Sequence, residues 1–334
     1  MRLSERLQAA WFQPDLAVFL WPLLPLSWIF RGVVALRRFL YQSGVLRAEH
    51  LPVPVVVVGN LIVGGAGKTP TVLWLVERLR AAGRRPGILS RGYGGAQAVA
   101  EVRADSDPRG VGDEPVLLAS RSGVPVFVGR RRAEAGRALL GAHPEVDVLV
   151  CDDGLQHLAL ERDVEIAVVD GRGVGNGLLL PAGPLREPAG RLDTVDAVVH
   201  NFQKIGANAA GPYAMTLLPG AFYRLNDPAT RVAAGDLQGR PLFAIAGIGH
   251  PQRFFDTLAA LGLRFEPRPF PDHHAFVPGD FDFAADGVVL MTEKDAIKCR
   301  PFLTGEAWVL PVTATIDPDL AAFVLEKIDG RQAA

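Results

Sequence analysis

This sequence contains little cysteine and almost no net charge. Its two cysteines, Cys151 and Cys299, form no CxxC or zinc-binding pattern, which excludes a disulfide framework and a zinc finger. A chain of 334 residues can bury a sizeable core without such crosslinks, and a reducing cytosol is the default compartment. The formal net charge of −1 argues against general nucleic-acid binding, because such proteins usually carry a basic excess. We therefore expect no nucleic-acid partner.

Short apolar runs that alternate with helical stretches dominate the rest of the chain. Such runs are typical of buried parallel strands, and their alternation with helices predicts an α/β fold with a doubly wound, mostly parallel sheet. The pattern restarts at Pro241, which predicts a second, smaller α/β domain. The expected organisation is a helical segment over residues 1–50, a main domain over 51–205, a linker over 206–240 and the smaller domain over 241–334.

The strongest functional signal is VGGAGKT, residues 63–69, which lies between a predicted strand and a predicted helix over 68–82. Backbone N–H groups of such a loop surround phosphate oxygens, and the helix N-terminus adds partial positive charge. Lys68 is expected to reach the β- and γ-phosphates of ATP, and the Thr69 hydroxyl to bind Mg²⁺. Ile62 replaces the first glycine of the usual GxxxxGK[ST] pattern, and the Gly-Gly pair at 64 and 65 could compensate. The predicted nucleotide-binding residues are Gly64, Gly65, Ala66, Gly67, Lys68, Thr69 and Pro70. The fold is therefore expected to be of the P-loop type.

A second signal is the pair Asp152–Asp153, which follows an apolar strand predicted over residues 146–150. Open α/β sheets place their ligands at the carboxyl ends of strands, and P-loop proteins hold their magnesium there. Successive residues point to opposite faces, so one carboxylate could bind Mg²⁺ while the other orients a neighbour. An acidic helix cap is the alternative.

Two weaker signals are carried by GDEP, residues 112–115, and FPDHHAF, residues 270–276. Asp113 or Glu114 could accept the proton of an attacking hydroxyl, although acidic residues and proline also suit the first turn of a helix. His273 or His274 could tune or relay a proton, and a structural turn is the alternative. TEKD, residues 292–295, superficially resembles a guanine-reading motif, but its lysine is one place late.

The N-terminal stretch Leu16–Phe30 is apolar, uncharged and contains two tryptophans. Its 15 residues would form roughly 22 Å of helix, less than the ~30 Å of a bilayer core, and Pro22 and Pro25 disfavour a straight span. Residues 1–50 carry six arginines against three acidic residues. This pattern is typical of a segment in the headgroup region of an anionic leaflet. A buried hairpin of helices is the alternative, and a signal peptide is rejected because a phosphate-binding motif follows directly.

Along the chain the following motifs occur in order: VGNLIVGGAGKTP, SRGYGG, VGDEP, CDDGLQH, ERDVEI, LLPAGPLREP, AGIGHPQRFF, DHHAF and MTEKDAIKC. By these motifs the sequence, from the apolar N-terminus to about Cys299, resembles the tetraacyldisaccharide 4′-kinase family, the lipid A 4′-kinases of the Gram-negative outer-membrane pathway. Each motif alone is ordinary, but their ordered set is highly specific. One apparent departure is His200–Asn201–Phe202, where Asn-Gly is expected after the strand.

The resemblance implies ATP-dependent phosphorylation of the 4′-hydroxyl of a tetraacylated glucosamine disaccharide 1-phosphate. It implies an enzyme on the cytoplasmic face of the inner membrane, peripheral or monotopic, and we expect a monomer. It assigns Asp113 to the carboxylate that takes the hydroxyl proton, with His273 tuning it, and Mg²⁺ to Thr69 with Asp152 or Asp153. Arg91 and Arg130–Arg132 are candidates for the substrate's 1-phosphate or for ATP.

Two other functions are weighed against this one. A membrane-tethered regulatory ATPase that dimerises around nucleotide would usually carry lysine where Val63 stands. A soluble small-molecule kinase would keep the N-terminal segment in its core and would ignore lipid vesicles.

Overall fold

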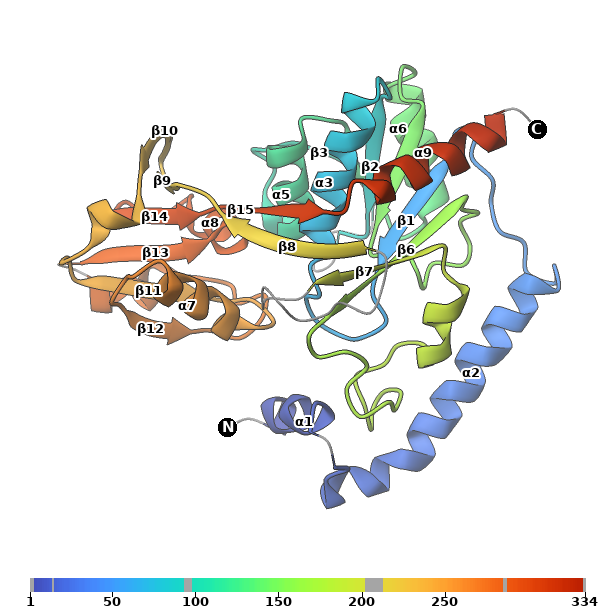
Figure 1. Ribbon diagram of the computed structural model, residues 1–334, viewed down its shortest axis with the longest axis horizontal. Coiled ribbons are helices and arrows are strands. Elements are labelled where there is room, and N and C mark those ends of the chain that lie inside the picture. Colours follow the sequence, from blue (N-terminus) through green and yellow to red (C-terminus); the bar gives the residue numbers. More distant parts are fainter. Residues whose placement is uncertain (1–2, 14, 93–97, 202–212, 285–286, 333–334) are drawn as a thin grey trace.

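The computed structural model describes residues 3–13, 15–92, 98–201, 213–284 and 287–332. Two β-sheets lie side by side, each with its own helices (Figure 1). The larger sheet contains nine strands and the smaller one six. The expected α/β fold with a large, mostly parallel sheet is confirmed.

The larger sheet has the strand order β15-β8-β7-β6-β1-β5-β2-β4-β3. All its neighbouring strands from β8 to β4 pair in parallel, and the two edge strands pair antiparallel with their neighbours. The strands are β1 Val55–Gly59, β2 Pro86–Ser90, β3 Ala100–Val102, β4 Val126–Val128, β5 Val148–Asp152, β6 Val164–Asp170, β7 Ala197–Asn201, β8 Tyr213–Pro219 and β15 Val312–Ile316.

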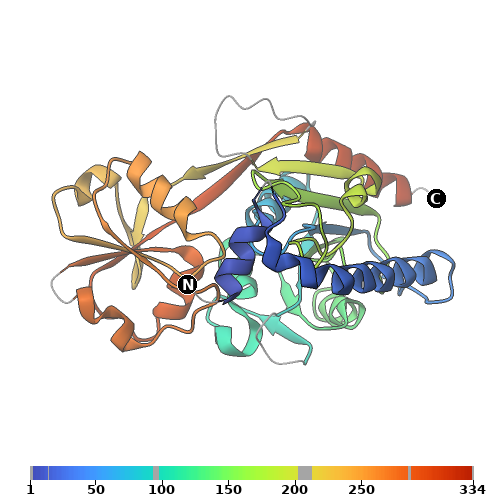
Figure 2. The same ribbon diagram turned by 90° about the horizontal axis from the view of Figure 1, so that it is seen from below.

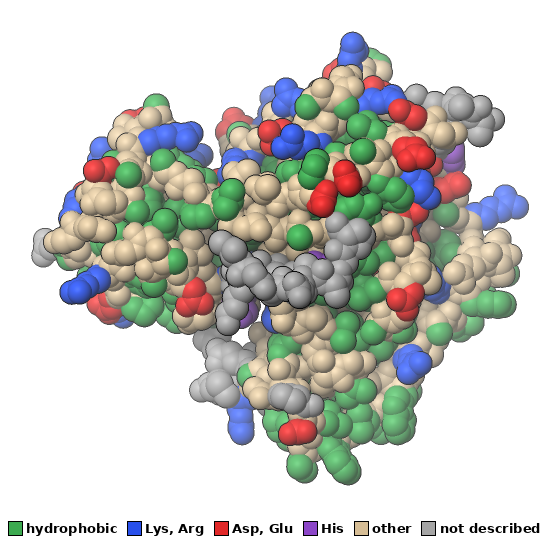
Figure 3. Space-filling view, viewed as in Figure 1, with side chains coloured by type: hydrophobic (Ala, Val, Ile, Leu, Met, Phe, Trp, Pro, Cys, Tyr) green, Lys and Arg blue, Asp and Glu red, His purple; other side chains and the backbone are tan. Residues whose placement is uncertain are grey.

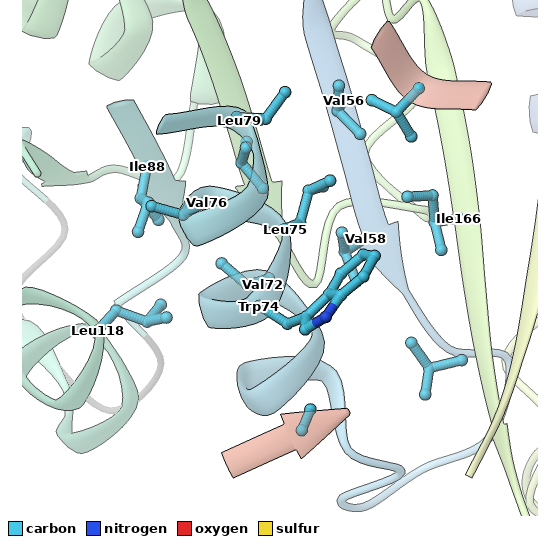
Figure 4. Packing of buried hydrophobic residues seen from close by; sticks show 14 of the residues in the cluster. Val56, Val58, Val72, Trp74, Leu75, Val76, Leu79, Ile88, Leu118 and Ile166 are labelled. Carbon is cyan, nitrogen blue, oxygen red and sulfur yellow. The ribbon is translucent and has the colours of Figure 1, made fainter. Parts of the chain in front are cut away.

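Both faces of this sheet are covered because its central strands are apolar on both sides. Val56 and Val58 pack with Leu75 of α3 on one face (Figure 4). Val55 and Val57 pack with Leu139 of α6 on the other. Fully apolar strands of this kind are characteristic of parallel sheets between two helical layers. The helices of this unit are α3 Lys68–Ala81, α4 Pro108–Val111, α5 Asp113–Ser122, α6 Arg132–Ala142 and α9 Asp319–Gln332, with the 3-10 helix η2 Ala189–Thr194.

The smaller sheet has the order β10-β9-β14-β13-β11-β12. Its strands are β9 Phe222–Arg224, β10 Asp227–Val232, β11 Leu242–Ala246, β12 Glu266–Pro269, β13 Val288–Thr292 and β14 Ala307–Leu310. Its helices are α7 Pro251–Ala260 and α8 Glu293–Cys299, with the 3-10 helices η3 Ala234–Leu237 and η4 Pro278–Ala284.

The predicted linker and the predicted C-terminal domain both differ from these units. Strand β8 lies within the predicted linker but belongs to the larger sheet, while β9 and β10 belong to the smaller one. Likewise β15 and α9, predicted in the second domain, return to the larger unit. Only Pro311 separates β14 from β15, so no linker-like composition marks the crossing. Figure 1 shows β8 and β15 side by side, extending from the smaller unit into the larger one. The GANAAG segment, residues 206–211, lies outside the described residues.

The N-terminal residues are helical, as expected, and expose much of their apolar surface. They form α1 Leu3–Trp11, the 3-10 helix η1 Val18–Leu23 and α2 Leu24–Gln42, and α2 runs along the outside of the larger unit (Figures 1 and 2). The Ser27 hydroxyl attaches α2 to the Leu179 carbonyl and to the Ala182 N–H. The alternative of a buried hairpin is wrong for these side chains. The exposed apolar residues are Val18, Phe19, Trp21, Leu26, Trp28, Ile29, Val33, Leu36 and Phe39.

Candidate active site

A cavity of about 920 Å³ lies between the two units, at the carboxyl ends of the central strands of the larger sheet. It is the meeting point of nearly all the predicted site residues. Of the predicted residues of the glycine loop, only Ala66, which is fully buried, does not line it. The lining residues from the prediction are Gly64, Gly65, Gly67, Lys68, Thr69, Pro70, Asp113, Asp152, Asp153 and His273.

The glycine loop is held open by hydrogen bonds from three side chains to three consecutive carbonyls. Asn60 Nδ2 donates to the Gly64 carbonyl over 3.0 Å and Arg172 Nη2 to the Gly65 carbonyl over 2.8 Å. Asn201 Nδ2 donates to the Ala66 carbonyl over 3.0 Å. The ends of strands β1, β6 and β7, and the residues that follow them, therefore fix the conformation of the loop. One of the three donors is Asn201, which belongs to the motif that departs from the family pattern.

Two glycines give this loop its shape. Gly64 has φ 89° and Gly67, the N-cap of α3, has φ 104°; only glycine adopts such values readily. Ile62, at the usual glycine position, is buried and forms an isolated bridge with Leu185. The position that departs from the usual motif is thus occupied by a buried core side chain. Gly64, two residues later, provides the positive φ of the turn.

Lys68 and Arg186 both face Asp153. Lys68 Nζ lies 3.6 Å from Asp153 Oδ1 and donates to Asn60 Oδ1 over 3.1 Å. Arg186 donates to both Asp153 oxygens over 3.1 Å and 2.9 Å. Burial raises the pKa of Asp153, but the two cations outweigh burial and hold that pKa well below its ordinary range. The Asp153 carboxylate is therefore ionised and paired with both cations. The backbone of Asp153 has φ 50°.

Asp152 differs from its neighbour in its surroundings. Its side chain is 1% exposed, and neither carboxylate oxygen accepts a hydrogen bond from the part of the chain that the structure describes. Burial, followed by the nearby Glu114 charge, raises the pKa of Asp152 to about 7. A buried carboxylate without partners normally requires a cation.

The donor set around Asp152 suits Mg²⁺ bound jointly with phosphate. Within the described residues, no group of three or more His, Cys, Asp or Glu side chains could hold a metal alone. Mg²⁺ in kinases usually takes one or two carboxylates, and phosphate and water oxygens complete its shell. The Thr69 hydroxyl and the Asp152 carboxylate line the same cavity, so the residues present fit this ion.

Asp113 and His273 meet across the cavity from different units. Asp113, the first residue of α5, is buried, and its Oδ2 lies 3.2 Å from His273 Nδ1. Burial raises the pKa of Asp113, but the His273 hydrogen bond and the Lys294 charge outweigh burial, so this pKa lies below its ordinary value. The same hydrogen bond raises the pKa of His273. His273 has φ 57°, and its backbone N–H donates to the Gly247 carbonyl.

Of the other candidates, His274 and Arg132 have structural partners, whereas Arg91 faces the cavity. His274 Nε2 contacts Asp280 Oδ2 over 2.8 Å, and its ring packs against Phe270 and Phe276, so it is a residue of the smaller core. Arg132 is buried and donates to the carbonyls of Gly129 and Arg130. Arg91 lines the cavity.

Sequence reasoning did not assign several groups that the structure brings to this site. Arg186 appeared only within the motif LLPAGPLREP, and Lys294 only as part of TEKD. Asn60 follows β1 and carries no distinguishing signal. Asp170, the last residue of β6, pairs with Arg172 and, over 2.8 Å, with Arg253 of α7. This buried carboxylate therefore joins the smaller unit to the glycine loop.

Comparison with known proteins adds to this geometry. The family model described as tetraacyldisaccharide-1-P 4′-kinase matches residues 19–329. Proteins named tetraacyldisaccharide 4′-kinase are similar, from Dechloromonas aromatica (56% identical, 99% of this chain, 100% of the relative) and Azoarcus sp. (55%, 93% of each). A crystal structure of LpxK from Aquifex aeolicus in complex with ATP shares 30% identity with a TM-score of 0.78, covering 93% of this chain and 100% of that one.

Proposed function

Because the chain belongs to the tetraacyldisaccharide-1-P 4′-kinase family, we propose how its residues bring about phosphoryl transfer to a lipid-borne sugar. The protein is an ATP-dependent kinase of the 4′-hydroxyl of a tetraacylated glucosamine disaccharide 1-phosphate. This reaction requires charge neutralisation and in-line positioning more than covalent chemistry. The observation that carries the residue assignments is that a phosphate loop, an unpartnered carboxylate and a carboxylate–histidine pair line one cavity.

The triphosphate of ATP binds to the loop Gly64–Thr69 at the N-terminus of α3. The N–H groups of this loop and the helix dipole attract phosphate oxygens, and the Lys68 ammonium approaches the β- and γ-phosphates. Lys68 now faces Asn60 and Asp153, which hold it at the edge of the cavity until an anion binds.

Thr69 and Asp152 are the residues that would hold Mg²⁺, and Asp153 orients Lys68 and Arg186. The engagement of Asp153 by two cations and the lack of partners at Asp152 support this division. When bound, Mg²⁺ supplies neutralisation of charge on the phosphate oxygens. Within this chain, Lys68 and Arg186 supply positive charge on the same side of the cavity.

Asp113 accepts the proton of the sugar 4′-hydroxyl, and His273 orients it. The pKa of Asp113 lies below its ordinary value, so the carboxylate is ionised at neutral pH and available as a base. As the new O–P bond forms, the hydroxyl proton passes to Asp113 and ADP departs with the electrons of the broken P–O bond. General-base groups typically contribute about 10²–10⁴-fold to the rate.

The exposed face of η1 and α2 docks the enzyme on the membrane that holds its substrate. In the described residues, Val18–Gln42 is one helical stretch of 25 residues, apolar and long enough to cross a membrane, with only 11% of its most apolar window buried. Figure 3 shows hydrophobic side chains over this part of the surface. The arginines nearby favour an anionic leaflet. We place the enzyme as a peripheral or monotopic monomer on the cytoplasmic face of the inner membrane, and the exposed apolar face of α2 supports the membrane contact in this proposal.

Replacement of Asp113 by asparagine tests the central assignment. Asp113→Asn keeps the size of the side chain and removes the base, so kcat should fall by about 10²–10⁴-fold while ATP affinity stays within about two-fold. Transfer of labelled γ-phosphate to the acylated disaccharide measures the first quantity, and equilibrium ATP binding the second. Near-normal turnover would remove Asp113 from the chemistry.

A further inference from the structure

Arg172 is held between the glycine loop, the end of β6 and the N-terminal segment. It lies two residues after β6, and its side chain is 15% exposed. Its Nη2 donates to the Gly65 carbonyl over 2.8 Å, and its guanidinium lies over the Phe12 ring, 5.0 Å from the ring centroid. Its Nε and Nη2 also donate to the Asp170 carboxylate over 2.8–3.1 Å. A carbonyl, a carboxylate and an aromatic face therefore fix one planar group.

The contact with Gly65 sets the direction of one peptide group in the loop. A trans peptide is planar, and its C=O and N–H point in opposite directions. Because the Gly65 carbonyl points to Arg172, the N–H of Ala66 points away from it, and N–H groups are what such a loop offers to an anion. Gly64 and Gly65 give this stretch little stiffness, so the peptide could turn over and present its carbonyl oxygen to a phosphate. The bond from Arg172 opposes that rotation.

Asp170 positions Arg172 and is shared with a second arginine. Its side chain is buried at the end of β6 and also accepts the Arg172 backbone N–H over 3.0 Å. Arg253 of α7, in the smaller unit, lies 2.8 Å from Asp170 Oδ2. Burial raises the pKa of Asp170, but the hydrogen bonds and charge of Arg172, with the charge of Arg253, outweigh burial and hold that pKa below its ordinary value. The carboxylate therefore stays ionised and pairs with both arginines.

Arg253 makes this arrangement depend on the smaller unit. A buried carboxylate needs compensating cations, so loss of Arg253 leaves Asp170 with one cation instead of two and loosens the group that orients Arg172. The backbone before α7 approaches the loop as well, because an added Cβ at Gly249 would lie 3.5 Å from the Gly65 nitrogen. The smaller unit thus reaches the glycine loop both through an ion pair and through its own backbone.

We propose that Arg172 is a positioning residue for ATP, which keeps the Gly65–Ala66 peptide in its phosphate-binding orientation, and that Arg253 supports it from the smaller unit through Asp170. Arg253 lines the cavity, whereas Arg172 is absent from its described lining, so Arg172 acts through the loop. The inference rests on the proposed function, since it takes the loop to be the site of the triphosphate. It adds to the phosphate-binding apparatus one residue from each unit, both outside the glycine motif.

Two other arginines are matched controls. Arg162 is buried to a similar degree (11% exposed) and pairs with Glu165 of β6 over 3.0 Å, and its carbonyl partners lie within residues 155–160. Arg121 of α5 pairs with Glu293 of α8, so it joins the two units at another place. Arg162→Met therefore reports the loss of a buried arginine, and Arg121→Met the loss of a contact between the units, each away from the glycine loop.

Equilibrium binding of ATP with Mg²⁺ to the full chain tests the proposal. Arg172→Met should raise Kd about ten- to hundred-fold, which is the typical contribution of a hydrogen bond from a charged donor, and KM for ATP should rise while kcat changes little. Arg253→Met should raise Kd about three- to ten-fold, and should add nothing in an Arg172→Met background, because both act through one route. Arg162→Met and Arg121→Met should each stay within about two-fold of the wild type.

A second measurement reports on the loop itself. Amide hydrogen exchange of residues 60–72 without nucleotide should be faster in Arg172→Met than in the wild type, because the loop loses an anchor, and unchanged in Arg162→Met. Arg172→Lys keeps the positive charge beside Asp170 but lacks the planar fork that binds a carbonyl and a carboxylate together. It should therefore melt close to the wild type and still bind ATP more weakly.

Wild-type ATP affinity in Arg172→Met, or an equal loss in Arg162→Met, would overturn the inference. If Arg253→Met costs as much in the Arg172→Met background as alone, Arg253 acts on the nucleotide directly and the link through Asp170 is wrong. Lys68→Met separates this result from a failure of the proposed function. Normal ATP affinity and turnover in Lys68→Met would show that the loop is not the triphosphate site, whereas a defective Lys68→Met beside an unaffected Arg172→Met rejects Arg172 alone.

Discussion

Replacement of Gly67 by alanine should destabilise the protein even without nucleotide. Gly67 begins α3 with φ 104°, and an added Cβ would lie 2.6 Å from Asn201 Nδ2 and 2.7 Å from Met215 Cε. Both distances are too short to persist, so the side chains of Asn201 and Met215 must shift. Because both are buried, the residues packed around them must shift as well. The positive φ costs about 1–2 kcal/mol for an L-residue, and forcing a methyl group into a packed site adds about 1–3 kcal/mol.

The expected loss of stability is therefore about 2–5 kcal/mol, or roughly 3–7 °C in Tm for a chain of this size. Gly65→Ala is the matched control, because Gly65 lacks a positive φ and an added Cβ would meet nothing within 4 Å. Calorimetric melts of both variants without ATP measure the effect, and ATP titration of each reports whether the loop still binds. If Gly67→Ala melts like the wild type, or if Gly65→Ala loses as much, the loop geometry deduced for Gly67 is wrong.

Three other predictions follow from burial and charge. Asp152→Asn should lose phosphate transfer yet melt higher than the wild type near pH 8, with a smaller gain near pH 5. A carboxyl whose pKa is raised from 3.8 to about 7 loses stability as pH rises between these two values; equal gains in magnesium-free melts at both pH values would contradict the prediction. His273→Gln should cost more stability near pH 5.5 than near pH 8.5, because a raised histidine pKa stabilises the fold below that pKa and the contribution vanishes above it; a cost that does not change with pH would refute it. Trp28→Glu should weaken cosedimentation with vesicles containing phosphatidylglycerol, because Trp28 is 65% exposed on α2; Val277→Glu, at an exposed apolar residue of the smaller unit, is the control, and equal losses would reject α2 as the docking face.

The local elements of the nucleotide site were predictable from the sequence. The buried strand β1, the glycine loop and the start of α3 at Lys68 follow one another within residues 55–81, and each depends on residues near in sequence. Apolar runs determine strands and glycines determine the turn, so these short-range preferences agree with the final fold. Asp152 and Asp153 were located for the same reason, at the end of β5.

Contacts between distant residues could not be predicted in this way. The sequence offers no means to tell Asp152 from Asp153, because the two carboxylates differ in their contact with Arg186. This residue, 33 positions further along the chain, donates to Asp153. Likewise, β14 passes into β15 through a single residue, so the return of the chain to the larger sheet leaves no trace in composition.

The sequence alone determined the class of fold, the phosphate loop and, through its ordered motifs, the family. Only the tertiary structure decided which carboxylate lacks a partner, which histidine faces Asp113 and that Arg172 joins the glycine loop to Asp170. Propensity and hydrophobic pattern act over a few residues, whereas a side chain's charge state depends on the neighbours that folding brings within a few ångströms of it.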